Sequence, residues 1–71
     1  MGYNIQDTIL GKLREERKPV AIFTTNGYQM KGLVLAYDQN VVVLNDSGKQ
    51  QIIFKSAIST IVPEAPVEIE N

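Results

Sequence analysis

The chain has 71 residues and contains neither cysteine nor histidine. A domain of this size buries only a modest fraction of its surface, so small domains usually gain stability from disulfides, a structural metal or oligomerisation. Without Cys and His, disulfides are excluded and the usual ligands of structural zinc are missing. The sequence therefore predicts a single domain that gains stability by associating with copies of itself, and we expect no metal or cofactor.

A short N-terminal helix is predicted. Asn4 is a suitable N-cap with Asp7 three residues further on, a variant of the capping box, and the helix should run to about Arg17, because Pro19 cannot continue it. Gly11 should weaken this helix by about 1 kcal/mol relative to alanine. The apolar residues of the segment fall on one stripe: Ile5, Ile9, Leu10 and Leu13.

From residue 20 onward the chain is rich in β-branched and aromatic residues that are separated by turn residues, which predicts five strands near residues 20–25, 28–37, 41–44, 49–54 and 58–62. Asn26-Gly27 is the strongest hairpin signal, and a two-residue loop would place Phe23 opposite Met30. Gly32 interrupts the second strand and predicts the bend that lets a sheet curl into a small barrel.

The last predicted strands are short, and they leave sheet edges without an evident partner inside the chain. Unpaired edges favour pairing with another copy, and a repeated head-to-tail contact closes into a ring. The predicted fold class is therefore mainly β with one N-terminal helix and a strongly bent five-stranded antiparallel sheet that assembles into a ring. Residues 1–63 should form the domain, and residues 64–71 an acidic, disordered tail.

The charge distribution separates the domain from its tail. The whole chain has a net charge of −1, but residues 1–63 carry seven basic and five acidic side chains. No apolar run approaches the roughly 18 residues of a membrane helix, so we expect no membrane role, and the lack of cysteine favours a cytoplasmic protein. Catalysis is not expected, because the domain's carboxylates occur in helix and turn contexts and no phosphate-binding loop is present: Asp7, Glu15, Glu16, Asp38 and Asp46.

Phe23, Tyr28 and Met30 are the most informative candidates for binding. With the predicted register they share one face of the hairpin, and they are either ordinary core or an exposed surface on which nucleobases stack. The opposite face favours the second interpretation, because it already offers a core. That core would start with Val20, Ile22 and Leu33 and continue into Val42, Leu44, Ile53 and Ile58. Gln29, Lys31 and Gln51 could then hydrogen-bond to base edges or phosphates.

Three basic residues have two interpretations each. Lys55, in a tight turn, is either a solvated lysine or, in a closed ring, part of a cationic spot on the axis. Arg14 and Arg17 either complement the helix dipole or contact phosphates on an outer edge.

Four blocks of the sequence resemble the bacterial Hfq family of Sm-like RNA chaperones. They are residues 4–7 (Asn-Ile-Gln-Asp), residues 26–32 (Asn-Gly-Tyr-Gln-Met-Lys-Gly), residues 37–38 (Tyr-Asp) and residues 54–60 (Phe-Lys-Ser-Ala-Ile-Ser-Thr). The last block is similar to the family's Lys-His-Ala-Ile-Ser-Thr signature, and the match spans residues 4–63. The resemblance implies a homo-hexameric ring, joined by the fourth strand of one subunit and the fifth of the next, that supports regulation by small RNAs and mRNAs during stress responses.

The resemblance also implies the positions of the RNA sites. On the face away from the helices, A-rich RNA would bind at Phe23, Gly27, Tyr28, Gln29, Met30, Lys31, Gln51 and Thr60. At the helix-side pore, U-rich ends would bind at Gln6, Gln39, Asn40, Lys55 and Ser56. On the outer rim, RNA would contact Arg14 and Arg17.

The departures from the family pattern all weaken the helix side. Ser56 replaces the usual His, and Asn40 replaces an aromatic residue that stacks uridine, so each bound nucleotide should lose about 1 to 3 kcal/mol of stacking. Glu15 and Glu16 dilute the positive field of the rim. We therefore predict an RNA chaperone that prefers A-rich RNA. The alternative is a ring with a decayed pore site that serves mainly in protein assembly.

Overall fold

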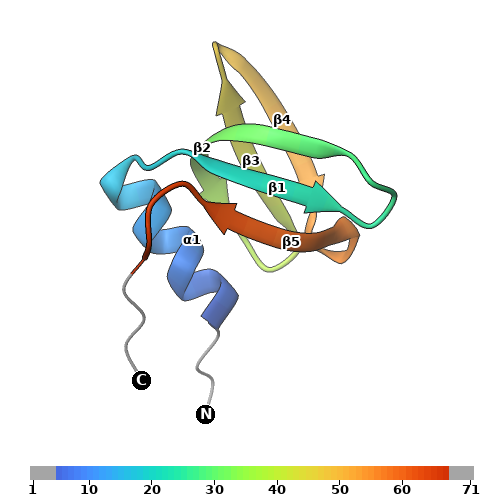
Figure 1. Cartoon of the computed structure of the whole chain (residues 1–71), viewed down its shortest axis with the longest axis horizontal. Helices are drawn as coiled ribbons and strands as arrows, with labels where there is room; N and C mark the ends of the chain where they lie inside the picture. The colour runs from blue at the N-terminus through green and yellow to red at the C-terminus, as the bar shows by residue number, and fades with distance from the viewer. Residues whose placement is uncertain (1–4, 68–71) are drawn as a thin grey trace.

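The computed structural model describes residues 5–67, which fold into one helix and five antiparallel strands (Figure 1). The elements are α1 (Ile5–Glu16), β1 (Val20–Thr24), β2 (Gln29–Tyr37), β3 (Val41–Asp46), β4 (Lys49–Phe54), the 3₁₀ turn η1 (Lys55–Ala57) and β5 (Ile58–Pro63). The predicted helix, the five strands and the mainly β fold with a strongly bent antiparallel sheet are confirmed, while assembly into a ring stays a prediction. The predicted N-cap, Asn4, lies outside the described residues.

The strands form a single bent sheet in the order β4-β3-β2-β1-β5. The bend is in β2, which pairs with β1 through residues 29–32 and with β3 from Leu33 onward. Gly32 (φ 158°) lies at the point where β2 changes from pairing with β1 to pairing with β3. A Cβ atom at this residue would lie 2.5 Å from the carbonyl oxygen of Asn45. Only glycine allows the two strands to approach so closely, so the bend predicted at this residue is confirmed.

The predicted register of the first hairpin is wrong by one residue. The Thr24 amide donates to the Tyr28 carbonyl (2.9 Å), so three residues form the loop instead of two. Phe23 consequently lies opposite Gln29, and Met30 lies opposite Ile22. The physical reason is the loop type: a three-residue loop that ends in a glycine with positive φ, here Gly27 (φ 93°), also matches the twist of the strands.

One core fills the space between α1 and the inner side of the bent sheet. Its buried residues are Leu10, Leu13, Val20, Ile22, Val34, Val42, Leu44 and Ile53. Leu33 had been predicted in this core, but it is half-buried, and Val34 takes its place. This error follows from the hairpin register, because a slip of one residue exchanges the two sides of a strand.

The start of the C-terminal tail is packed against the domain. The Glu64 amide donates to the Pro19 carbonyl (3.1 Å), and Val67 packs against the core. Residues 64–67 form no helix or strand but contact the domain through Glu64 and Val67, and the predicted disorder of the tail stays a prediction. Residues 68–71 lie outside the described part. No helix within residues 5–67 has the length and apolar character needed to cross a membrane.

Candidate functional site

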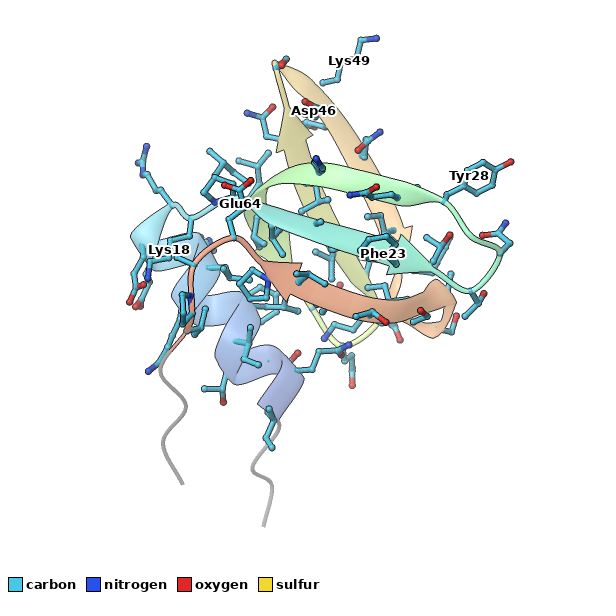
Figure 2. All side chains as sticks on the ribbon, in the orientation of Figure 1. Lys18, Phe23, Tyr28, Asp46, Lys49 and Glu64 are labelled. Carbon is cyan, nitrogen blue, oxygen red and sulfur yellow. The ribbon has the colours of Figure 1, made fainter. Side chains whose placement is uncertain are left out.

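The predicted cluster of Phe23, Tyr28 and Met30 does not form within one subunit. Because Met30 lies opposite Ile22 and Phe23 opposite Gln29, Phe23 and Met30 point to opposite sides of the hairpin. Figure 2 shows Phe23 on β1 and Tyr28 well away from it at the end of the hairpin. The hairpin thus carries two separate surfaces, and the prediction of one continuous face is corrected.

The first surface, here called the outer row, crosses three neighbouring strands. Phe23 of β1 lies directly opposite Thr60 of β5 on one side and Gln29 of β2 on the other. Directly opposite residues point to the same side of a sheet. Phe23 is half-buried, whereas its two neighbours and Lys31 are exposed. The outer row therefore places an aromatic ring between two side chains that can form hydrogen bonds.

The second surface, here called the hairpin pocket, is a cavity of about 230 Å³ beside the hairpin loop. Its lining residues are Thr24, Asn26, Tyr28, Met30, Ile52, Ile53, Phe54 and Ala57. Tyr28 is 65% exposed, whereas Met30 is half-buried and packs against the core. An exposed aromatic ring beside an apolar hollow can stack on a planar ligand such as a nucleobase.

Thr24 and Asn26 belong to the hairpin pocket but were not predicted as site residues. Thr24 is only 7% exposed; its hydroxyl donates to Oδ1 of Asn26 (2.6 Å) and accepts the backbone N–H of Tyr28 (3.1 Å). The only sequence signals for them are the Asn26-Gly27 turn and its place in the block of residues 26–32, in which Gly27 but not Asn26 is a predicted site residue. The two side chains give the pocket a polar wall.

Gln51 carries an unsatisfied polar atom. It lies on β4 opposite Leu44, and its Oε1 is buried without a hydrogen-bond partner among residues 5–67. An unpaired buried acceptor costs about 1 to 3 kcal/mol, so a donor brought by a ligand or a neighbouring subunit would be favourable there. Gly27, also predicted as a site residue, has open space around its Cα atom.

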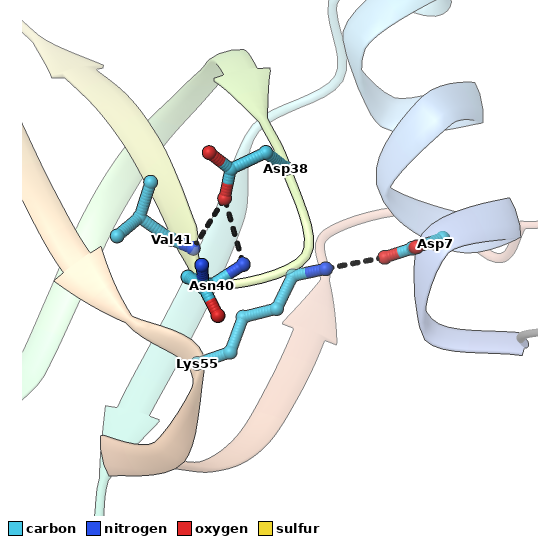
Figure 3. A network of polar contacts seen from close by, with 5 residues as sticks. All are labelled: Asp7, Asp38, Asn40, Val41 and Lys55. Atoms are coloured by element: carbon cyan, nitrogen blue, oxygen red, sulfur yellow. Dashed lines mark hydrogen bonds and ion pairs between the residues drawn. The ribbon is translucent and has the colours of Figure 1, made fainter.

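The second predicted site lies near the start of α1, where Lys55 is held by neighbouring groups (Figure 3). Its amine forms an ion pair with Asp7 of α1 (2.5 Å) and lies 5.7 Å from the centre of the Tyr37 ring. The Lys55 side chain is only 12% exposed. Asp7 and Tyr37 were missed as site residues; Asp7 had been assigned to helix capping. We call Lys55, Asp7 and Tyr37 the lysine turn.

The loop between β2 and β3 is fixed beside the lysine turn. The Asp38 carboxylate accepts the backbone N–H groups of Asn40 (2.7 Å) and Val41 (2.8 Å), as Figure 3 shows. These two hydrogen bonds, with a smaller contribution from the charge of Lys55, lower the pKa of Asp38 below its ordinary value of 3.8. The carbonyl of Asn40 in turn accepts the Lys55 amide (2.8 Å).

The remaining predicted pore residues are chain neighbours of Asp7 or Lys55 or belong to the loop between β2 and β3. Gln39, Asn40 and Ser56 are exposed, and Gln6 is half-buried in the first turn of α1, next to Asp7 in the chain. The backbone bond between Asn40 and Lys55 brings the two predicted segments together. None of these four side chains has an aromatic ring, so the residues predicted for the pore provide hydrogen bonds but no stacking surface of their own.

The predicted rim residues lie at the end of α1. Arg14 and Arg17 are exposed and line a cavity of about 230 Å³ together with Leu33, Val34 and Leu35. Arg17 has a positive φ of 54°, and the next amide, of Lys18, donates back to Leu13 (3.2 Å), which closes the helix. Lys18 also forms an ion pair with Glu16 (3.0 Å).

Comparison with known proteins agrees with this architecture. The family model described as "Hfq protein" matches residues 5–68. The RNA-binding protein Hfq of Moorella thermoacetica is 50% identical over 66 residues, covering 93% of this chain and 79% of the relative. The RNA-binding protein Hfq of Desulfitobacterium hafniense (strain DSM 10664 / DCB-2) is 47% identical over 66 residues, covering 93% and 80%.

Two solved structures share the fold. One is described as the crystal structure of the pleiotropic translational regulator Hfq; it superimposes with a TM-score of 0.79 at 47% identity and covers 83% of this chain and 98% of that chain. The other, an Hfq protein from Anabaena sp., gives a TM-score of 0.77 at 30% identity and covers 83% and 95%. With the helix, the bent five-stranded sheet and the family match over residues 5–68, this chain belongs to the Hfq family and has its Sm-like fold.

Proposed function

We propose that this protein is a non-catalytic RNA chaperone that binds A-rich single-stranded RNA through the outer row and the hairpin pocket. The observation that carries the proposal is Tyr28, an aromatic residue that is 65% exposed and lines the hairpin pocket. Stacking on an aromatic side chain contributes about 1 to 3 kcal/mol per base. The relatives named above are RNA-binding proteins, which supports the same class of ligand.

A hexameric ring would join the two surfaces that one subunit keeps apart. The two edge strands are β4 and β5, and β4 exposes the large apolar residues Ile52 (66%) and Phe54 (62%), which also line the hairpin pocket. The outer row ends at Thr60 on β5. If β4 of one subunit pairs with β5 of the next, the hairpin pocket of the first comes close to the outer row of the second. An adenine could then lie between Tyr28 of one subunit and Phe23 of its neighbour.

The pore should bind U-rich RNA only weakly. The charge of Lys55 is compensated by Asp7, and neither Asn40 nor Ser56 provides a ring for stacking. Phosphate affinity depends on uncompensated positive charge, so the lysine turn contributes less than a solvated lysine would. This asymmetry favours small-RNA and mRNA regulation that depends on the A-rich site.

Titration of the intact protein with oligo(A) and oligo(U) tests the proposal. We expect tighter binding of oligo(A), and a loss of about five- to one-hundred-fold in oligo(A) affinity for Phe23→Ala, Tyr28→Ala or Met30→Ala. Lys49→Ala is the matched control: Lys49 lies at the tip of the β3–β4 hairpin, away from Tyr28 (Figure 2), and its loss should have little effect. If the Phe23, Tyr28 and Met30 variants all kept the oligo(A) affinity of the wild type, the assignment of the A-rich binding site would be wrong.

A second candidate function is a ring that serves mainly in protein assembly. The compensated charge of Lys55 favours it, because the pore lacks a free cation among the lysine-turn residues. In that case the ring would form with the mass of a closed oligomer, yet neither homopolymer would bind with the salt dependence that phosphate contacts produce.

A further inference from the structure

The hairpin loop contains the one asparagine of the chain that is followed by glycine, Asn26-Gly27. In such a pair the backbone nitrogen of the glycine can attack the side-chain amide carbon of the asparagine, because no side chain on the glycine obstructs the approach. A nitrogen–carbon bond forms, ammonia leaves and a five-membered imide results. One water molecule then opens the imide to aspartate or isoaspartate, so the net change is water consumed and ammonia released.

Both reacting groups of this pair are accessible and held by a single residue. Asn26 and Gly27 are exposed, and a Cβ atom built on Gly27 would meet no atom within 4 Å. The Thr24 hydroxyl donates to Oδ1 of the Asn26 amide (2.6 Å), and the Thr24 carbonyl accepts the N–H of Gly27 (3.0 Å). The electrophilic amide and the attacking nitrogen are thus both tied to Thr24, and the imide can form only when this exposed loop opens locally.

We propose that Asn26 is a site of spontaneous deamidation and that Thr24 sets its rate by restraining the two reacting groups. The reaction places a new carboxylate on the wall of the hairpin pocket, because Asn26 lines that cavity together with Tyr28 and Met30. Each subunit gains one negative charge at the surface where RNA phosphates would pass. Deamidation therefore weakens RNA binding as the protein ages, an effect that rests on the proposed function.

The site itself is tested on the unmodified sequence. The assembled protein is incubated at mildly alkaline pH, and peptide mass spectrometry with isoaspartate detection follows each asparagine over time. Asn40 and Asn45 are internal controls: bulkier residues follow them, and the Val41 amide is bound by Asp38. We expect modification at Asn26 to be at least severalfold faster than at either control. Equal rates at the three positions, or an unmodified Asn26, would overturn the assignment.

The role of Thr24 is tested by two substitutions of the same residue. Thr24→Val removes the hydroxyl at nearly constant shape, and Thr24→Ser retains it. The valine variant should deamidate severalfold faster than the wild type and the serine variant at a similar rate, with circular dichroism showing that both remain folded. Equal rates in the folded valine and serine variants would show that the hydroxyl is not the restraint.

The consequence for RNA is tested with the product itself. Asn26→Asp should lower oligo(A) affinity about two- to fivefold for each site that the RNA engages, and the loss should shrink as salt screens the charge. Asn26→Ser is the neutral control and separates loss of the amide from gain of the charge. Equal affinities of the Asp and Ser variants would overturn the charge effect. If the unmodified protein does not bind oligo(A) at all, the proposed function fails, while the deamidation rates still decide the chemical assignment.

Discussion

At the scale of single residues, backbone groups in this protein determine which side chains are tolerated. Asp38 closes the loop between β2 and β3 by accepting two backbone N–H groups, and Gly32 allows β2 to pass within van der Waals distance of the Asn45 carbonyl. In both cases a short or absent side chain is required by the position of the backbone. Each case gives a prediction that can be tested in the isolated protein.

Asp38 should contribute to stability in a pH-dependent way. Its pKa is lowered in the folded state by the N–H groups of Asn40 and Val41, so its contribution is present above the ordinary value of 3.8 and is lost as the pH falls through the lower, folded-state pKa. The difference in melting temperature between the wild type and Asp38→Ala should therefore shrink as the solution is acidified below pH 3.8. An NMR titration of the carboxyl should show a midpoint below that value; a higher midpoint would contradict the account.

Gly32→Ala should destabilise the protein by roughly 2 to 4 kcal/mol, because the new Cβ would lie 2.5 Å from a backbone oxygen that cannot move aside freely. Gly48→Ala is the matched control: Gly48 also has a positive φ, of 87°, but has open space around it. Its cost should be limited to backbone strain, about 1 kcal/mol. Urea unfolding measures both, and similar losses for the two variants would exclude the steric explanation.

At the scale of elements, the packing of α1 against β2 explains why the helix contains Gly11, although glycine has a low helix propensity. A Cβ atom at Gly11 would lie 2.9 Å from the hydroxyl of Tyr37, whose ring also faces Lys55. Intrinsic helix propensity and tertiary packing therefore oppose each other at this position. The close approach keeps α1 near the lysine turn, where Asp7 of the same helix forms its ion pair.

The conflict at Gly11 can be measured by a double-mutant cycle. Gly11→Ala alone should give no gain in the free energy of unfolding, because the methyl group meets the Tyr37 hydroxyl. In a Tyr37→Phe background the same change should stabilise the protein by about 1 kcal/mol, the propensity difference between glycine and alanine. Additive effects of the two substitutions in thermal or urea unfolding would show that the hydroxyl is not the obstacle.

At the scale of the whole molecule, exposed apolar residues on an edge strand mark the surface expected to join subunits. β4 is an edge of the sheet and exposes Ile52 and Phe54 by more than 60%, which is unfavourable for an isolated subunit. The proposed ring would cover them by pairing β4 with β5 of a neighbour. It would also bring Phe23 and Tyr28 together, which one subunit does not do.

Phe54→Lys should therefore disrupt the assembly. A charge on the edge strand opposes strand pairing, so the particle mass in solution should fall toward that of smaller species and the melting temperature should drop. Leu35→Lys is the control, since Leu35 is 39% exposed on β2, an inner strand of the sheet. It should leave the mass unchanged. A full-size assembly in the Phe54→Lys variant would argue against β4 as the joining edge.

The sequence by itself determined the elements and the family. Pro19 indicates that the helix must end before it, turn residues separate five β-branched runs, and Gly32 marks the bend. These are local effects of backbone geometry and propensity. The four blocks at residues 4–7, 26–32, 37–38 and 54–60, taken together, indicated the Hfq family. The sequence also indicated the outer-row residues Phe23, Gln29 and Thr60. Of the hairpin pocket it indicated only Tyr28 and Met30, and its grouping of Phe23, Tyr28 and Met30 on one face was wrong.

Only the tertiary structure decided which side chains share a surface. The register of the hairpin depends on whether Thr25 belongs to the loop. The Asn26-Gly27 pair is compatible both with a two-residue loop and with a three-residue loop that includes Thr25. The three-residue loop places Phe23 and Met30 on opposite sides of the hairpin. The ion pair between Asp7 and Lys55 joins residues that are 48 positions apart, so no local pattern signals it. Local sequence fixes where the chain turns, but long-range packing fixes which charge is compensated and which aromatic ring remains free to bind.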